Sequence, residues 1–467
     1  MMSRLASASA AARDRWVLGA VLAAVFLRAG LVALFPDPVP VNDEIDYWRL
    51  AEALARGEGF ASNFRPPLHP AFMAVFIGMG GDAVAVRLAQ AVLGALSVVL
   101  VGLVAERVGG LRAARAAAWF VALDPVLVGF SHLLWSETLY IALLLLGLFL
   151  LLRGAGSWKG WDWAGAGLAL GLASLARPQL LTFLPWLLPW AWLQARRAGV
   201  VPRRLLVSFG LLTLATCCVV LPWSLRNFQV SGDWFLVDTN GPYNLLVSTE
   251  PGAHRVDKDD RWSPRWAAIG NLHYMVASER APGRVQRLAL ERAVQRIRAN
   301  PARYLEKSLW EAGHLFTLDN FVLRHLRNDW YGVGSPPGLT AGLTLLCVLW
   351  TMALYAGGGV GLLAAPASPF RGFALLAIVH AVLLFGVTYS LSRYAVPLRP
   401  LFAIALAWAL THPVAVRERV LGNRWVAALA LLVVAVLLGV WVRDLPLLAD
   451  LWETGGKGFL FVRSATP

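Results

Sequence analysis

The sequence predicts an all-α polytopic membrane protein with about eleven transmembrane helices. Its 467 residues are 58% hydrophobic and only 15% charged, whereas soluble domains carry about 25% charged residues. The mean hydropathy is correspondingly high, at +0.60. A bilayer core needs about 20 apolar residues per helical span, and runs of that length recur along most of the chain. A soluble core would not repeat such runs so regularly.

Hydropathy places the predicted spans at 16–35, 82–105, 113–131, 138–153, 162–176, 179–193, 205–222, 339–363, 372–390, 394–411 and 425–442. The segment 67–81 is too short to cross and is bounded by proline and glycine. It is expected to lie along the outer interface. Arginine-rich short loops such as 196–204 and 417–424 then fall on the cytoplasmic side if the N-terminus is cytoplasmic.

This arrangement leaves two large outer loops, 36–81 and 223–338. The chain divides into an N-terminal transmembrane module at 1–222, the outer loop 223–338, C-terminal transmembrane helices at 339–442 and a short outer tail at 443–467. The start of the long loop is rich in Gly, Pro and Asn, which predicts a loop with two short strands. Periodic apolar positions from Arg284 to Asn300 predict an amphipathic helix. Asn300 and Pro301 should end it and start another.

The net charge of +14 suits anionic lipid headgroups and lipid-linked phosphates, and no nucleic-acid-binding signature accompanies it. The three cysteines, Cys217, Cys218 and Cys347, all lie in apolar segments, so neither a disulfide framework nor a metal cluster is expected. The eight histidines show no metal-ligand spacing. Basic residues precede the first span, as in a signal peptide, but no obvious cleavage site follows it, which favours an uncleaved anchor.

Acidic residues follow the first span directly, in the stretch "NDEIDYWRL" that contains Asp43, Glu44 and Asp46. Acids at a helix N-terminus complement the helix dipole, so a capping role explains them without any function. Their placement on the outer side beside "NFRPPLHP" favours more than capping. In that segment Arg65 stands on a stiff proline pair, where a guanidinium suits a phosphate.

Other charged residues border the outer ends of spans. Glu137 lies in the short turn before the fourth span, where Ser136 and Glu137 could simply cap a helix. Asp124 falls within the third span, where acids are costly and usually functional, although Asp124-Pro125 could also mark a kink. The arginines at outer ends are Arg177, Arg226 and Arg393. Several guanidiniums near carboxylates suggest an anionic ligand such as a pyrophosphate or phosphate headgroup.

These motifs together resemble the polytopic GT-C glycosyltransferases, in particular the dolichyl-phosphate-mannose protein mannosyltransferases and the bacterial lipid A aminoarabinose transferases. The resemblance runs in the family's order over about residues 28–405. It rests on "NDEIDYWRLAEALARGEGF", "RPPLHPAFMAVF", "HLLWSETLYIALLLL", "LASLARPQLL", "LPWSLRNFQVSGDW", "ANPARYLEKSLW" and "SRYAVPLRPLFAIALA". Each motif alone matches the family only loosely, whereas the whole set in this order is fairly specific to it.

The resemblance implies a polyprenyl-phosphate sugar donor, a periplasmic active site in the bacterial inner membrane and an inverting transfer. The family's acid in the first outer loop matches Asp43, which is expected to be the catalytic base, with Glu44 or Asp46 assisting. Glu137 matches a second acid, either catalytic or structural. Arg65, Arg226 and Arg393 are the implied donor-phosphate contacts. Further candidates are Asp46, Tyr47, His69 and Arg177.

Two departures limit what the resemblance implies. The chain ends soon after its last span, and its long loop is shorter than the folded insert of the protein mannosyltransferases. A lipid or glycan acceptor is therefore favoured over a protein. Some relatives use a divalent cation and others do not, and no ligand set is evident. The alternatives left open are a transporter or flippase of lipid-linked sugars, a surface-polysaccharide ligase or polymerase, and a purely structural role.

Overall fold

The computed structural model describes residues 9–36, 43–249, 282–318, 321–327 and 337–453. These residues form helices and connecting turns without any strand, so the all-α fold class is confirmed. The two short strands predicted near the start of the long loop are wrong within the described part. Helix α9 (Pro202–Ser231) instead continues past the predicted end of its span, and α10 (Asn240–Ser248) follows.

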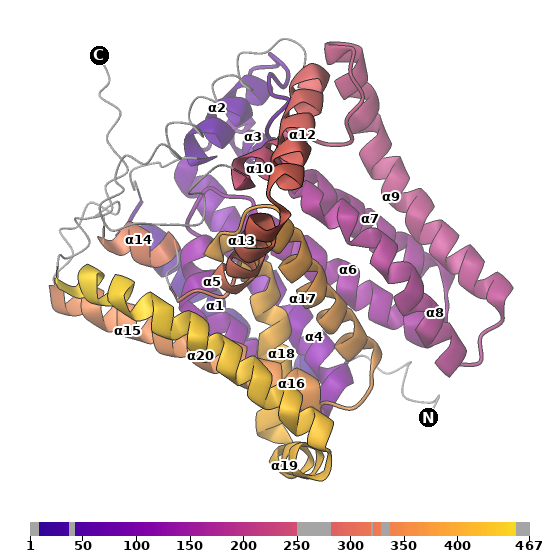
Figure 1. The fold of residues 1–467 in the computed structure, drawn as a ribbon, viewed down its shortest axis with the longest axis vertical. Coiled ribbons are helices and arrows are strands. Elements are labelled where there is room, and N and C mark those ends of the chain that lie inside the picture. The colour runs from indigo at the N-terminus through magenta and orange to yellow at the C-terminus, as the bar shows by residue number, and fades with distance from the viewer. Residues whose placement is uncertain (1–8, 37–42, 250–281, 319–320, 328–336, 454–467) are drawn as a thin grey trace.

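In the first half of the chain, α1 and α6 pack along the long helix α4 (Ala83–Leu123), and α7 packs between α6 and α9 (Figure 1). Apart from α4, the helices before α9 are α1 (Arg15–Leu34), α2 (Asp43–Ala55), α3 (Leu68–Gly78), α5 (Pro125–Phe130), α6 (Glu137–Ser157), α7 (Gly160–Ala176) and α8 (Leu187–Arg197). Inside α4, Gly110 has φ of 75° and breaks the helix between the predicted spans 82–105 and 113–131. A glycine is favoured there because side chains rarely adopt this conformation.

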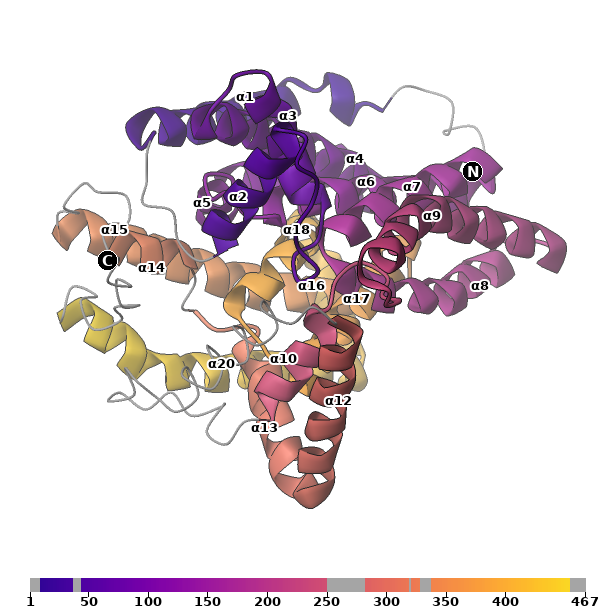
Figure 2. The same cartoon turned by 90° about the horizontal axis from the view of Figure 1, so that it is seen from above.

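The second half supplies the remaining helices, and α18 packs on α4 to join the two halves. They are α12 (Pro282–Ala299), α13 (Pro301–His314), α14 (Phe321–Arg327), α15 (Pro337–Met352), α16 (Gly358–Ala364), α17 (Pro369–Val387), α18 (Arg399–Thr411), α19 (Pro413–Gly422) and α20 (Arg424–Glu453). A 3₁₀ turn, η5 (Ser392–Leu398), links α17 to α18. Helices α12 and α13 form a pair that extends away from the bundle (Figure 2).

Eight helices in the described residues are long and apolar enough to cross a membrane, which identifies a multi-pass membrane protein. The predicted count of eleven stays a prediction for three reasons. Helix α4 runs from one predicted span into the next across the break at Gly110. Helix α7, with 17 residues, is at the lower limit of the length that spans a bilayer. The sixth predicted span is divided into short 3₁₀ turns and α8. Helix α3 falls within the predicted segment 67–81 and α12 covers most of the predicted amphipathic stretch, whereas the position of α3 at the outer interface stays a prediction.

Helices α7 and α9 approach closely because Gly167 leaves room for the backbone of α9. A Cβ on Gly167 would lie 2.2 Å from the carbonyl oxygen of Leu212, and Thr216 Oγ1 donates to the Gly167 carbonyl at 3.1 Å. We expect Gly167→Ala to lower the free energy of unfolding by about 1–3 kcal/mol, because overpacking forces the helices apart. Thermal unfolding in detergent measures this. The control is Gly210→Ala on α9, where a Cβ meets nothing within 4 Å; equal melting temperatures for the two variants would contradict the prediction.

Candidate active site

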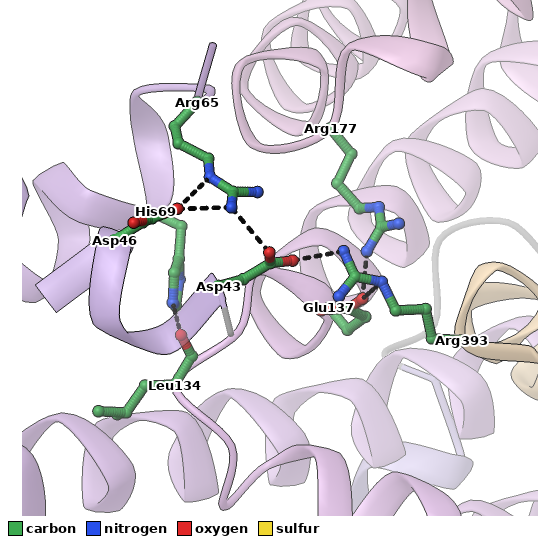
Figure 3. A network of polar contacts seen from close by, with 8 residues as sticks. All are labelled: Asp43, Asp46, Arg65, His69, Leu134, Glu137, Arg177 and Arg393. Carbon is green, nitrogen blue, oxygen red and sulfur yellow. Dashed lines mark hydrogen bonds and ion pairs between the residues drawn. The ribbon is translucent and has the colours of Figure 1, made fainter. Parts of the chain in front are cut away.

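The carboxylate of Asp43 is held between two guanidiniums. Asp43 opens α2, and its Oδ1 lies 2.8 Å from Arg65 Nη2 while its Oδ2 lies 2.7 Å from Arg393 Nη2 (Figure 3). The Asp43 and Arg393 side chains keep 16% and 15% of their surface exposed. The bridge is therefore largely shielded from bulk solvent without being fully buried.

The second acid, Glu137, joins the same network through Arg393. Glu137 opens α6 and pairs with Arg177, and its Oε1 also lies 3.6 Å from Arg393 Nε (Figure 3). Its side chain is only 1% exposed. Arg393 thus connects a deep carboxylate, Glu137, to the more accessible one, Asp43. At the other end of the network, Asp46 Oδ2 accepts from Arg65 Nη2 at 2.6 Å.

The chain segments explain why these charges meet. Both acids stand in the first turns of helices, where the helix dipole favours negative charge. Arg65 and Arg177 each precede a proline, which disfavours helical backbone at the preceding residue. Arg177 accordingly has extended backbone, with φ of −147° and ψ of 99°. These two arginines therefore project from breaks between helices toward the acids.

Charge pairing decides the protonation state of the accessible acid. Burial by itself would raise the pKa of Asp43, but Arg393 and Arg65 outweigh it and hold that pKa well below its usual range. Burial, reinforced by the neighbouring Asp43 carboxylate, raises the pKa of Tyr47 to about 12. At neutral pH Asp43 is therefore an ionised carboxylate and Tyr47 a neutral phenol.

Glu44 and His69 both contact the backbone of Leu134. Glu44 Oε1 accepts from the Leu134 N–H at 2.7 Å, and His69 Nε2 lies 3.0 Å from the Leu134 carbonyl oxygen (Figure 3 shows the His69 contact). Both residues are almost fully buried, at 2% and 1% exposed. Burial lowers the pKa of His69 to about 4, so His69 is neutral and donates from Nε2. These side chains attach α2 and α3 to the turn that precedes Glu137.

Two side chains from α4 hold the same turn. Gln90 Nε2 donates to the carbonyl oxygens of Ser131 and Leu133, at 3.1 and 2.8 Å, and Arg87 Nε donates to that of His132 at 3.1 Å. Buried carbonyls without partners are costly, so this set fixes the turn firmly. The position of Glu137 follows from it.

Arg226 has no ion-pair contact with the acids in the described residues. Its guanidinium donates to the Phe60 carbonyl and lies 4.8 Å from the ring centroid of Trp223. Nearby, the Thr239 N–H donates to the Asn63 carbonyl at 2.9 Å. Arg226 thus holds the segment before Arg65, rather than joining the network itself.

Aromatic rings line the network, and sequence reasoning did not single them out. The Arg393 Cζ lies 4.7 Å from the ring centroid of Trp135, and the Arg177 Cζ lies 5.5 Å from that of Tyr394. Cation–π contacts of this kind stabilise and orient guanidiniums. The sequence could have indicated these rings by their position beside predicted site residues, since Trp135 precedes Ser136-Glu137 and Tyr394 follows Arg393.

A further carboxylate near Arg65 was also missed. Asp238 accepts from the Asn240 N–H at 3.1 Å. Burial raises the pKa of Asp238 to about 7, although Arg65 acts in the opposite direction. The sequence "VDTNG" indicated only a turn, and the approach to Arg65 depends on the tertiary fold.

The site does not fit a resident cation. In the described part of the chain, no group of three or more His, Cys, Asp or Glu side chains is arranged to hold a metal ion. Asp43, Asp46 and Glu137 are each paired with arginine, and guanidiniums at these oxygens would repel a cation.

The comparisons with known proteins agree with the fold predicted from sequence. Residues 64–223 match the family model described as dolichyl-phosphate-mannose-protein mannosyltransferase. The chain is similar to the oligosaccharyltransferase of Archaeoglobus fulgidus in its apo form, with 17% identity, a TM-score of 0.51, and coverage of 94% of this chain and 55% of that one. A structure of the same enzyme, AglB, with an inhibitory peptide and a dolichol-phosphate gives 17% identity, a TM-score of 0.50 and coverage of 91% and 54%.

The chain therefore spans about half the length of these archaeal enzymes. A structure of ArnT from Cupriavidus metallidurans bound to undecaprenyl phosphate is also similar, at 16% identity, a TM-score of 0.41 and coverage of 86% of this chain and 78% of that one. No curated protein matches the sequence significantly. The resemblance to GT-C glycosyltransferases is confirmed, and the chain has a GT-C-type fold.

Proposed function

We propose that this chain is a membrane glycosyltransferase that moves a sugar from a polyprenyl-phosphate donor to an acceptor hydroxyl, with Asp43 as general base. The observation that carries the proposal is the Asp43 carboxylate bridged at 2.8 and 2.7 Å by Arg65 and Arg393. It offers a base and two phosphate-binding groups at one partly accessible point. The GT-C-type fold supports the same reaction class.

The donor phosphate is proposed to take over the contacts that the arginines make with Asp43. Planar guanidiniums bind phosphate oxygens as well as carboxylates. Once Arg65 and Arg393 turn toward the phosphate, the pKa of Asp43 rises from its depressed value, because those charges now face another anion. Donor binding therefore converts a weakly basic carboxylate into a competent base.

The transfer itself is proposed as one displacement. The acceptor oxygen attacks the anomeric carbon of the donor sugar and its proton passes to Asp43. The bond between the anomeric carbon and the phosphate oxygen breaks, and its electron pair leaves with the polyprenyl phosphate. Arg65 and Arg393 stabilise that departing charge. A single displacement inverts the anomeric centre and requires no second carboxylate nucleophile.

The other predicted site residues receive supporting roles in this proposal. Glu137 and Arg177 orient Arg393 from the buried side, and Asp46 orients Arg65. Glu44 and His69 hold the turn before Glu137, and Arg226 holds the segment before Arg65. We assign the site to the outer face of a bacterial inner membrane. The acceptor is a lipid, glycan or protein hydroxyl.

Transfer by Asp43→Asn is expected to fall about 100-fold or more, because positioned general bases contribute roughly 10²–10⁴-fold. The measurement uses protein reconstituted in liposomes with a panel of polyprenyl-phosphate sugars. The control is Glu58→Gln, an exposed acid whose ion pair among the described residues is with the neighbouring Arg56. Full activity in Asp43→Asn would remove Asp43 as the base. Translocation of the lipid-linked sugar without transfer by the wild type would replace the proposal with a flippase.

A further inference from the structure

Outside the acid–arginine network, three polar side chains of α13 converge on the C-terminal end of α17. Lys307 Nζ donates to the carbonyl oxygens of Gly386, Val387 and Thr388, at 3.0, 3.0 and 2.8 Å. The lysine is only 3% exposed. All three donor positions of the ammonium group are thus used on consecutive carbonyls at the end of one helix.

The neighbouring side chains on α13 hold the same segment. Glu311, which is fully buried, accepts from the Ser390 N–H at 2.9 Å. The hydroxyl of Tyr304 donates to the Val387 carbonyl at 2.5 Å. Residues spaced three or four apart share one face of a helix, so one face of α13 holds 386–390 at both ends.

This segment leads directly to Arg393, the residue that bridges the two acids. Arg393 is the third residue after Ser390 in the sequence, and an extended chain of three residues reaches at most about 11 Å. Phe385 on α17 also stacks on Tyr394, with ring centroids 4.5 Å apart. The backbone of Arg393 therefore has little freedom once 386–390 is fixed.

We propose that Lys307 is a positioning residue that sets the place of Arg393 opposite Asp43 through the carbonyls of 386–388. Its catalytic consequence rests on the function proposed above, whereas its structural consequence does not. The long loop between α9 and α15 would then control the geometry of the phosphate-binding arginine without touching the substrate.

A simple helix cap is the competing explanation, since a cation at a helix C-terminus satisfies free carbonyls and the dipole. Capping does not require a buried lysine, because surface side chains or water can serve the same carbonyls. Placing Lys307 and Glu311 in the interior, at 3% and 0% exposed, is costly. Their joint use on the segment before Arg393 favours positioning.

The test compares Lys307→Met with Lys307→Arg, and takes the exposed Arg303→Met on the same helix as the control. The first readout is a cryo-EM structure of each variant in nanodiscs with a bound antibody fragment. In Lys307→Met we expect the separation of Arg393 Nη2 and Asp43 Oδ2 to grow from 2.7 Å to beyond hydrogen-bond distance, about 3.5 Å. Lys307→Arg should retain the pair. An unchanged 2.7 Å separation in Lys307→Met would overturn the proposal, whatever the activity.

The second readout is donor kinetics. A displaced Arg393 should lower kcat/KM about 100-fold through both a raised donor KM and a lowered kcat, with recovery in Lys307→Arg and no further loss when combined with Arg393→Ala. A loss of folded protein alone lowers apparent kcat and leaves KM unchanged, which would count against positioning. If the wild type transfers no sugar, the proposed function fails, and the separation of Arg393 and Asp43 in the variant structures still decides whether Lys307 positions Arg393. If Lys307→Met does not fold, Tyr304→Phe takes its place, with the distance between Arg393 Nη2 and Asp43 Oδ2 and the donor KM measured in the same way. No change in either quantity would overturn the proposal.

Discussion

Arg393→Ala is expected to lower transfer about 10⁴-fold, with the largest activity loss of any single substitution in the site. Arg393 is the only described residue that contacts both Asp43 and Glu137 through ion pairs. Removing one preorganised donor to a departing charge costs about 10²–10³ in rate. Releasing a general base from its position forfeits part of a further 10²–10⁴ or so. The two losses together predict a decrease of about 10⁴ or more.

Arg393→Ala is also expected to change how transfer depends on pH. Arg393 is the larger of the two charge effects that hold the pKa of Asp43 below its usual range. Without it the pKa of Asp43 rises toward the ordinary value for an aspartate, about 3.9. Residual activity of Arg393→Ala should therefore decline on acidification at a higher pH than the wild type does, because protonation removes the base.

Steady-state kinetics across pH, with protein reconstituted in liposomes, measures both effects. Arg393→Lys keeps the charge and loses the planar fork, so it should recover part of the activity. The exposed Arg203→Ala on α9 is the control for loss of a surface arginine. Arg393→Ala activity within tenfold of wild type would exclude the proposed role.

The sequence alone predicted much of the site because its members border helix ends. Asp43, Arg65, Glu137 and Arg393 each flank an apolar segment, and the alternation of spans places such ends on a common side. The amphipathic repeat of α12 and the Asn300-Pro301 break were predictable for a similar reason. Local periodicity and capping chemistry decide them, and Asn300 does cap α13 through a bond to the Arg303 N–H.

The unpredicted parts depend on side-chain direction. Successive residues on a helix point about 100° apart, so Glu44 cannot follow Asp43 toward the arginines and reaches Leu134 instead. Arg226 has the residue type and location of a phosphate contact, yet its guanidinium meets the Phe60 carbonyl. Sequence reasoning could place these residues near the site but could not orient them.

The second unpredicted feature is a buried ion pair between the two halves of the chain. Asp124 was singled out as a membrane-depth acid, and its partner proves to be Arg399, 275 residues later, with Arg399 Nε 2.8 Å from Asp124 Oδ2. The side chains are 2% and 3% exposed. Asp124 Oδ1 also caps α5 by accepting from the N–H groups of Val126 and Leu127, at 2.9 and 3.1 Å. One carboxylate therefore stabilises a helix start and joins α5 to α18.

Asp124→Asn is expected to lower the free energy of unfolding by about 3–5 kcal/mol, since it leaves the Arg399 charge buried and uncompensated. Asparagine caps helices nearly as well as aspartate, so this variant isolates the lost ion pair from the lost cap. Asp124→Leu removes both and should cost about 1 kcal/mol more. Reversible unfolding in mixed detergent micelles, followed by tryptophan fluorescence, measures these differences.

The double variant Asp124→Asn with Arg399→Met distinguishes a lost attraction from an unpaired charge. If most of the cost is the buried unpaired guanidinium, removing it with a side chain of similar volume should recover much of the stability, because replacing both members of a buried pair is often nearly neutral. Arg399 Nη1 also lies 3.3 Å from Thr351 Oγ1, so recovery should stop short of the wild type. A double variant no more stable than Asp124→Asn alone would show that the Arg399 charge tolerates isolation. The ion pair would then have to stabilise the protein by its attraction alone.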